Sequence, residues 1–426
     1  MTNTKQLITN LENNEYKDLL TDIYLDTDKI PYQTERYIAA IKRYEELYGE
    51  DEVSIYSAPG RSEIGGNHTD HQHGEVLAAS INNDAIAIVK PLDEPVVKVV
   101  SGKYPLLSIN IDDIEKKDKE EGTTLALIKG VLFGMKDRGY NIGGFQAYIT
   151  SDVLIGAGLS SSAAFETVIG TILSGLYNDM KVSPIEIAII GQYAENVYFG
   201  KPCGLMDQMA CSVGNLVHID FNDPADPIVE KVEFDFSAQG YSLCITDTKG
   251  SHADLTADYA AVPKEMKEVA ACLGKEVLGK TTREELFANI NTLRKKVNDR
   301  AVLRAIHYVE ENTRVQKEVT ALNSNDFATF LNTVKASGDS SFKYLQNVYT
   351  NHDIHHQNVS VALAISDSVL GTNGVSRVHG GGFAGTIQAF VKNDAVPKYK
   401  KAMDDVFGKD ACSILKIRKY GGMKVL

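Results

Sequence analysis

A glycine- and serine-rich segment is the strongest chemical signal in the sequence. It lies between residues 145–154, which read as a strand, and residues 163–177, which read as a helix. Glycines let the backbone approach a ligand closely, and the first N–H groups of a helix are unpaired and carry partial positive charge. These properties predict a phosphate-binding loop, in which the serines can also cap the helix. Its residues are Gly156, Ala157, Gly158, Leu159, Ser160, Ser161 and Ser162.

The loop is not the P-loop of the Walker type, because no Gly-Lys-Ser or Gly-Lys-Thr follows it. Taken alone, a Gly-x-Gly-x-Ser pattern also suits an ordinary turn in front of a helix. The phosphate assignment therefore depends on the segments around the loop.

The elements that would position this loop are a mixture of strands and helices. Residues 1–50 read as polar helices, and residues 54–100 alternate apolar, β-branched runs with turns, which predicts strands. Residues 125–136 read as a helix, residues 255–370 are mostly helical, and residues 386–391 read as a strand. The pattern predicts a mixed α+β fold.

Length and composition limit the class of protein. The 426 residues are more than one hydrophobic core usually supports, which predicts two domains. A net charge of −13 argues against nucleic-acid binding as the main role. The five cysteines contain no Cys-x-x-Cys pair, which indicates reduced thiols. The first residues show no signal pattern, and no apolar run reaches the roughly 20 residues of a membrane span. We expect a cytoplasmic protein without a membrane or nucleic-acid partner, as a monomer or weak homodimer.

Three segments together resemble the kinases of galactose, homoserine, mevalonate and phosphomevalonate, the GHMP kinases. They are VLIGAGLSSSAAFE around the loop, APGRSEIGGNHTDHQHGEVL from Ala58 and HGGGFAGT from His379, and they occur in the family's order. The resemblance covers roughly residues 55 to 420. It implies an α+β fold of two lobes, an N-terminal mixed-sheet lobe and a C-terminal lobe with a ferredoxin-like core, with the active site in the cleft between. We expect residues 1–230 to form the ATP- and sugar-binding lobe and residues 231–426 the second lobe.

Two of these regions are most similar to galactokinases. That family carries Gly-Arg-x-Asn-x-Ile-Gly-Glu-His-x-Asp-Tyr where this chain has GRSEIGGNHTDH from Gly60, and KPCGLMDQM from Lys201 resembles its segment with the catalytic aspartate. The resemblance implies transfer of the ATP γ-phosphate to the anomeric C1 hydroxyl of D-galactose. It implies Asp207 as the residue that orients the sugar hydroxyl and accepts its proton, with Arg61 stabilising charge beside it. Phosphoryl transfer needs such positioning and charge stabilisation.

The resemblance also implies binding residues. Mg²⁺ prefers hard oxygen ligands, and Ser162 and Glu195 are the implied pair, with Glu195 on a helix that begins near Ser183. For the sugar, Asp70 is the implied acceptor. The other implied sugar contacts are Asn67, His68, Thr69, Gly204 and Tyr259, and the loop of Gly380 to Gly385 is expected to support the phosphate loop.

Departures from the family pattern leave the exact sugar open. Asn67 stands where galactokinases have a glutamate near the C6 hydroxyl, His71 replaces a tyrosine, and His379 replaces a threonine. A neutral amide at position 67 would tolerate a C6 carboxylate that a glutamate would repel. Galacturonate or a modified galactose such as N-acetylgalactosamine is therefore an alternative substrate, and a sugar sensor without turnover is the alternative that is not an enzyme.

Overall fold

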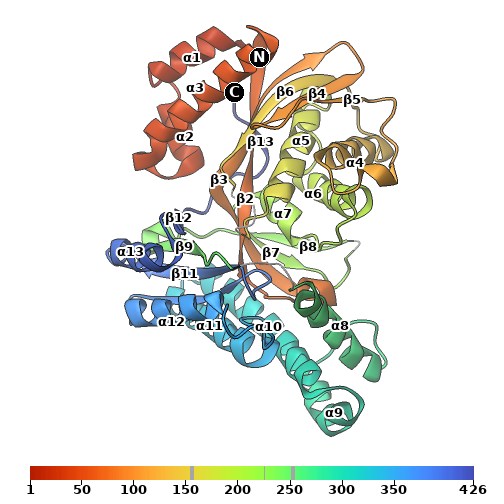
Figure 1. Ribbon diagram of the computed structural model, residues 1–426, viewed down its shortest axis with the longest axis vertical. Coiled ribbons are helices and arrows are strands. Elements are labelled where there is room, and N and C mark those ends of the chain that lie inside the picture. The colour runs from red at the N-terminus through yellow and green to blue at the C-terminus, as the bar shows by residue number, and fades with distance from the viewer. Residues whose placement is uncertain (154–157, 225, 251–254) are drawn as a thin grey trace.

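The chain forms two β-sheets, each covered by helices, in a computed structural model that describes residues 1–153, 158–224, 226–250 and 255–426 (Figure 1). The larger sheet has the strand order β1-β2-β3-β6-β4-β5, while β7 pairs with β3 and β8, and β13 pairs with β2. Only β4 and β6 pair in parallel among these strands of the described residues, so the sheet is mixed, as expected. Its strands are β1 (Thr2–Asn3), β2 (Glu52–Gly65), β3 (Glu75–Leu92), β4 (Val96–Ser101), β5 (Leu107–Asn110), β6 (Gly144–Ser151), β7 (Leu216–Asp220), β8 (Ile228–Val232) and β13 (Met423–Lys424).

Helices cover both faces of the larger sheet (Figure 1). Because side chains alternate along a strand, Ile86 and Ile88 of β3 pack against one helical layer while Ala87 and Val89 pack against the other. The first layer contains α1 (Thr4–Glu12), α2 (Lys17–Tyr24) and α3 (Ile30–Tyr48). The second contains α4 (Thr124–Asp137), α5 (Ser161–Tyr177), α6 (Pro184–Tyr193), the π-helical segment η4 (Ala194–Phe199) and α7 (Met206–Val213). The helices predicted at 125–136 and 163–177 are confirmed as α4 and α5.

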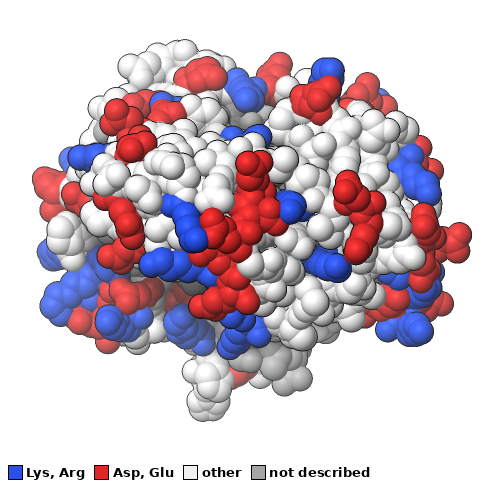
Figure 2. Space-filling view, turned by 90° about the horizontal axis from the view of Figure 1, so that it is seen from above, with Lys and Arg blue, Asp and Glu red and all other residues white. Residues whose placement is uncertain are grey.

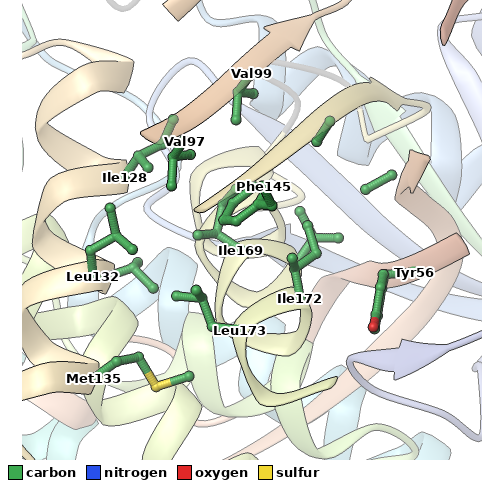
Figure 3. Close-up of a cluster of buried hydrophobic side chains, with 14 of the residues drawn as sticks. Tyr56, Val97, Val99, Ile128, Leu132, Met135, Phe145, Ile169, Ile172 and Leu173 are labelled. Carbon is green, nitrogen blue, oxygen red and sulfur yellow. The ribbon is translucent and has the colours of Figure 1, made fainter. Parts of the chain in front are cut away.

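Figure 3 shows how the second layer is fixed to the sheet. Leu132 of α4 and Ile169 and Leu173 of α5 lie around the ring of Phe145 from β6. Each of these side chains is fully buried, and burying such a side chain contributes about 1.5–3 kcal/mol. This packing holds α5 firmly against the sheet, so the start of α5, where the serines lie, has a defined place.

The smaller sheet is antiparallel, with the order β10-β11-β9-β12. Along the chain its elements follow the pattern strand, helices, strand, strand, helix, strand, which is the ferredoxin-like arrangement and confirms that expectation. The strands are β9 (Tyr241–Asp247), β10 (Gly374–His379), β11 (Thr386–Lys392) and β12 (Cys412–Leu415). The helices are α8 (Thr256–Cys272), α9 (Arg283–Lys296), α10 (Asp299–Asn323), α11 (Phe327–Ser340), α12 (Asn358–Leu370) and α13 (Val396–Phe407).

The two sheets share one apolar cluster. It contains Leu77 of β3 and Ala163 of α5 together with Phe330 of α11 and Phe390 of β11. The chain passes from one sheet to the other between β8 and β9, and its last residues return to the larger sheet, where the Ile55 N–H donates to the Leu426 carbonyl at 2.7 Å. The division into residues 1–230 and 231–426 stays a prediction.

The surface carries both signs of charge. Figure 2 shows basic and acidic side chains interspersed over the face seen from above, with acidic side chains running across its middle. Among the helices that the structure describes, none has the length and apolar character that a membrane crossing requires.

A buried polar cluster joins α10 to the turn that follows β2. The Glu311 carboxylate accepts hydrogen bonds from the N–H groups of Gly66 and Asn67, both at 3.3 Å, and from Arg314 Nε at 2.6 Å. Glu318, two turns further along α10, is fully buried, and neither of its carboxyl oxygens has a hydrogen-bond partner among the described residues. The cluster therefore combines a well-satisfied carboxylate with an unsatisfied one.

Replacing Glu318 with glutamine is expected to stabilise the protein increasingly as the pH rises. Burial raises the pKa of Glu318 well above its ordinary value, and the nearby Glu311 carboxylate adds to this effect. The folded state therefore binds the proton more tightly than the unfolded state. The contribution of Glu318 to the free energy of unfolding is greatest below its unfolded-state pKa of about 4.5. Above that pH it falls by about 1.4 kcal/mol per pH unit until the folded-state pKa is reached. Glutamine carries no such dependence.

Thermal unfolding of both proteins between pH 5 and pH 8 checks this prediction. The matched control is Glu12→Gln, at an exposed position of α1. A difference in melting temperature between Glu318→Gln and the parent that stays constant over this range would show that Glu318 is already ionised in the folded protein.

Candidate active site

Arg61 and Asp207, which are 146 residues apart in the sequence, form a two-pronged ion pair. Arg61 Nε donates to Asp207 Oδ1 at 2.7 Å, and Nη2 donates to Oδ2 at 2.9 Å. Arg61 follows a bulge in β2 after Pro59, and Asp207 lies in the first turn of α7. A bulge redirects the side chain that follows it, and a planar guanidinium fits both oxygens of a carboxylate. The structure thus brings together the two residues that the sequence implies as catalytic.

The same pair contacts the described end of the glycine–serine loop. Arg61 Nη1 donates to the Gly158 carbonyl, and Ser160 Oγ donates to Asp207 Oδ2. Gly158 and Ser160 both have positive φ, 67° and 58°, and for serine this left-handed conformation is unusual. It turns the Ser160 hydroxyl towards Asp207. Gly156 and Ala157 lie outside the described residues.

Two side chains of this loop are occupied within the protein. Ser160 stands at the N-cap position of α5 but makes no capping hydrogen bond, because its hydroxyl is bonded to Asp207. Leu159 is 1% exposed and packs in the cluster shared by the two sheets, so only its backbone could face a nucleotide. Ser161 and Ser162 form the first turn of α5, where backbone N–H groups are unpaired and favour an anion.

Asp207 is held in its ionised form. Burial by itself raises the pKa of Asp207, but the Arg61 guanidinium outweighs burial and holds that pKa below its ordinary value. A carboxylate offers about four acceptor positions, and Arg61 Nε, Arg61 Nη2 and Ser160 Oγ take three of them. Among the described donors, one acceptor position on Asp207 remains for a ligand hydroxyl.

Ser162 and Glu195, the implied cation ligands, also lie together. Ser162 Oγ donates to Glu195 Oε1 at 3.1 Å, and Lys201 Nζ reaches the same oxygen at 2.9 Å. Glu195 is 2% exposed whereas the Lys201 side chain is 61% exposed. The lysine therefore supplies positive charge to a buried carboxylate at the point where a divalent cation would contact it. A serine hydroxyl and a carboxylate are the hard oxygen donors that Mg²⁺ takes in small number, together with water and phosphate.

Asp70 and Gly204 are in contact, and Asp70 lies near enough to Asp207 for the Asp207 charge to act on it. A methyl group at Gly204 would overlap Asp70 Oδ2, so the two positions are in close contact. Asp70 is half-buried, and burial raises the pKa of its carboxyl above the ordinary value. His68 lies nearby, with Nε2 3.2 Å from the Gly381 carbonyl. These three implied sugar contacts share one region with Asp207.

Gly204→Ala is expected to raise the KM for the sugar at least tenfold while changing the KM for ATP little. The added methyl group must displace the Asp70 carboxylate, which we expect to accept hydrogen bonds from sugar hydroxyls. Losing one hydrogen bond to a charged group costs about 1.5–3 kcal/mol. Steady-state kinetics with each substrate varied separately provide the measurement. The matched control is Gly279→Ala, where an added methyl group would make only ordinary van der Waals contacts, the nearest at 3.4 Å. A Gly204→Ala enzyme with an unchanged sugar KM would separate Asp70 from sugar binding.

Asn67 does not face the sugar region, contrary to expectation. It is 0% exposed, and Nδ2 donates to Glu63 Oε1 at 3.1 Å and to the Gly380 carbonyl at 2.7 Å. Its Oδ1 accepts from Asn347 Nδ2 at 2.9 Å and from Ser341 Oγ at 3.2 Å. Both the nitrogen and the oxygen of the Asn67 amide are therefore hydrogen-bonded to other protein groups. The amide is not available to distinguish substituents at C6 of a sugar.

Thr69 also has a different place from the one expected. Its side chain is fully buried, and its hydroxyl lies 2.8 Å from the Gly66 carbonyl and 2.6 Å from the Glu75 carbonyl. The residue shapes the turn that carries His68 and Asp70. Its hydroxyl is used within this turn.

The second glycine loop packs against both binding regions. Tyr259 donates its hydroxyl to the Gly382 carbonyl at 2.8 Å and lies against Gly381, which His68 also contacts. A methyl group at Gly158 would lie 3.1 Å from Thr386 Oγ1. The loop therefore lies beside the phosphate loop, as expected, and holds Tyr259 next to His68.

Sequence reasoning missed two contributors to this region. His379 is buried, and burial together with the Arg61 charge lowers its pKa well below the ordinary value. The neutral ring accepts from the Glu63 N–H at 3.2 Å and donates from Nδ1 to Thr386 Oγ1 at 2.9 Å, which ties the glycine loop to β2. The second contributor is Lys201. The sequence offered one indication of it, because Lys201 is the basic residue of the segment KPCGLMDQM.

Comparisons with known proteins agree with this arrangement. The chain matches the model of the galactokinase galactose-binding signature over residues 42–91 and that of the GHMP kinases N-terminal domain over residues 126–215. The galactokinase of Thermotoga petrophila is 30% identical over 354 residues, which cover 83% of this chain and 93% of that protein. The galactokinase of Streptomyces coelicolor is 28% identical over 368 residues, which cover 86% of this chain and 92% of that protein.

A solved structure extends the agreement to three dimensions. The crystal structure of Lactococcus lactis galactokinase complexed with galactose matches with a TM-score of 0.76 at 26% identity, covering 90% of this chain and 98% of that one. The sequence match to the Thermotoga protein and the shared fold lead to one conclusion. The chain belongs to the galactokinase family of the GHMP kinases and is an ATP-dependent sugar kinase.

Proposed function

We propose that the protein transfers the γ-phosphate of ATP to the anomeric C1 hydroxyl of D-galactose, giving galactose 1-phosphate. The observation that supports the proposal is the Arg61–Asp207 ion pair, which contacts Gly158 and Ser160. Asp70 contacts Gly204 and lies near Asp207 and His68. The ion pair would then be close to both a nucleotide at the start of α5 and a sugar beside Asp70.

Asp207, Arg61 and Ser160 each have a separate proposed role in phosphoryl transfer. Asp207 uses its remaining acceptor position to orient the C1 hydroxyl, and its low pKa makes it a weak base, so the proton moves to it as the new O–P bond forms. Arg61 carries permanent charge and stabilises the negative charge on the attacking oxygen and the transferring group. Ser160 holds the Asp207 carboxylate in place through its hydrogen bond. Most of the rate enhancement would come from positioning and charge stabilisation.

Mg²⁺ is the proposed cofactor, and Ser162 with Glu195 would hold it. When bound with ATP, the cation neutralises charge on the β- and γ-phosphates. Lys201 balances the charge of the buried Glu195 carboxylate, and its exposed side chain is free to turn towards phosphate oxygens.

A neutral sugar fits the region better than a sugar acid. The carboxylates of Asp70 and Asp207 both belong to the sugar side, and like charges at short range destabilise binding. Since the Asn67 amide is buried and fully bonded, it gives no support to a substrate with a C6 carboxylate.

All five cysteines are free thiols, which is consistent with a cytoplasmic location.

A substrate panel tests the proposal. ADP release is measured with ATP, Mg²⁺ and galactose, galacturonate, N-acetylgalactosamine or glucose. We expect galactose to have the highest kcat/KM, at least tenfold above galacturonate. A higher value for galacturonate or for N-acetylgalactosamine would replace galactose as the substrate. ATP binding that depends on sugar, without turnover on any of them, would identify a sensor.

A further inference from the structure

Gln208 is the neighbour of Asp207 on α7, but its side chain serves a different place. Successive residues on a helix point about 100° apart, so Asp207 meets Arg61 while Gln208 turns between α5 and η4. It is 0% exposed. Gln208 Nε2 donates to Glu195 Oε2 at 2.8 Å and to Glu166 Oε2 at 3.1 Å.

The amide group thus links two buried carboxyl groups. An amide nitrogen has two hydrogens, and each serves one glutamate. The nitrogen end of the amide faces Glu195, which is paired with Lys201 and accepts the hydrogen bond, while Gln208 Oε1 has no hydrogen-bond partner among the described residues. Since Gln208 holds Glu195 Oε2, the other oxygen, Oε1, is left facing Ser162 and Lys201.

The second glutamate anchors this arrangement to α5. Glu166 is 1% exposed and lies four residues after Ser162, so both side chains lie on the same face of the helix. A methyl group at Gly191 of α6 would lie 3.2 Å from both Gln208 Cγ and Glu166 Oε2. The space around the bridge is therefore filled, and the Gln208 side chain has little freedom to move.

From this geometry we infer that Gln208 is a positioning residue for the divalent cation, with Glu166 as its anchor. Gln208 fixes the rotation of the Glu195 carboxylate so that Oε1 stays beside Ser162 Oγ, the other proposed ligand. The bridge also joins the cation region to the helix that carries Asp207. This inference rests on the proposed role of Glu195 in holding the cation.

Mn²⁺ binding provides a test that does not depend on turnover. Mn²⁺ is titrated, with detection by electron paramagnetic resonance, into protein saturated with adenylyl imidodiphosphate. Replacing a group that orients a metal ligand typically weakens metal binding about 10- to 100-fold, so Gln208→Met is expected to raise the Kd for Mn²⁺ at least tenfold. The KM for galactose should stay within threefold. The control is Gln33→Met, a buried glutamine that accepts from Arg36 Nη1 at 3.1 Å on α3.

Variants of Glu166 keep the test decisive if Gln208→Met does not fold. Glu166→Gln retains an acceptor oxygen for the Gln208 amide and should bind Mn²⁺ within threefold of the parent, whereas Glu166→Leu should bind it at least tenfold more weakly. Equal Mn²⁺ affinity in Glu166→Leu and the parent, or in a folded Gln208→Met and the parent, would overturn the inference.

Glu195→Gln separates this inference from the proposed cation site. If Glu195→Gln weakens Mn²⁺ binding but Gln208→Met does not, Glu195 holds the cation and Gln208 does not position it. If Glu195→Gln leaves Mn²⁺ binding unchanged, the cation lies elsewhere and both statements fall.

Discussion

Asp207→Asn is expected to lower kcat by about 10³-fold, within the 10²- to 10⁴-fold range of general acid–base catalysis, while the Kd for adenylyl imidodiphosphate stays within threefold. Asparagine keeps the shape of the side chain but cannot accept the proton of the C1 hydroxyl, and it loses the charge paired with Arg61. The nucleotide contacts proposed at the start of α5 are unaffected. Pre-steady-state turnover and calorimetric nucleotide binding supply the two measurements.

The chain offers a matched control for this variant. Arg294 and Asp299 form a pair of the same geometry on the surface, with Nε to Oδ1 at 2.7 Å and Nη2 to Oδ2 at 3.0 Å. Asp299→Asn should leave kcat unchanged. If Asp207→Asn kept more than a tenth of the parent's kcat, Asp207 would not be the proton acceptor.

Arg61→Met is expected to reduce kcat by about 10³- to 10⁵-fold, the range measured when an arginine stabilises a phosphoryl-transfer transition state. Two effects combine in this variant. The charge beside the transferring group is lost, and without the guanidinium the burial of Asp207 raises the pKa of its carboxyl. The pH at which kcat falls on the acid side should therefore move upwards, which a pH–rate profile between pH 4 and pH 9 would detect.

Arg61→Lys distinguishes charge from geometry. Lysine keeps the charge but lacks the fork that bonds both Asp207 oxygens, so it should recover part of the loss and remain at least tenfold below the parent. Arg294→Met is the control. In the double variant Arg61→Met with Asp207→Asn, the losses should be far from additive, because the two residues act as one unit. Additive losses would mean that Arg61 and Asp207 act independently.

The sequence predicted the catalytic centre better than the sugar contacts, and the reason is physical. Arg61, Asp207 and Ser162 stand in short segments that resemble those of galactokinases, and Glu195 was implied by the same resemblance. Asn67 was misjudged because its burial depends on Asn347 and Ser341, about 280 residues away in the sequence. No local pattern shows that such distant side chains will use the amide completely.

The secondary structure was likewise predicted best where the sequence pattern is local. The helices α4 and α5 were predicted with nearly correct bounds, because they are continuous apolar segments of helical length. The short strands β10 and β12 were not predicted. The pairing of β12 is with β9, about 170 residues earlier in the chain, so no local pattern indicates it. Ser160 makes no capping hydrogen bond because its hydroxyl donates to Asp207, which is distant in the sequence.

The position of the transferred phosphate shows whether Asp207 orients the C1 hydroxyl. The protein is incubated with ATP, Mg²⁺ and galactose, and the product is examined by ³¹P and ¹³C nuclear magnetic resonance. With Asp207 orienting the anomeric hydroxyl, all phosphate should appear on C1 of the sugar. Phosphate on any other carbon, or ADP formed without a sugar phosphate, would contradict the placement of the C1 hydroxyl against the Arg61–Asp207 ion pair.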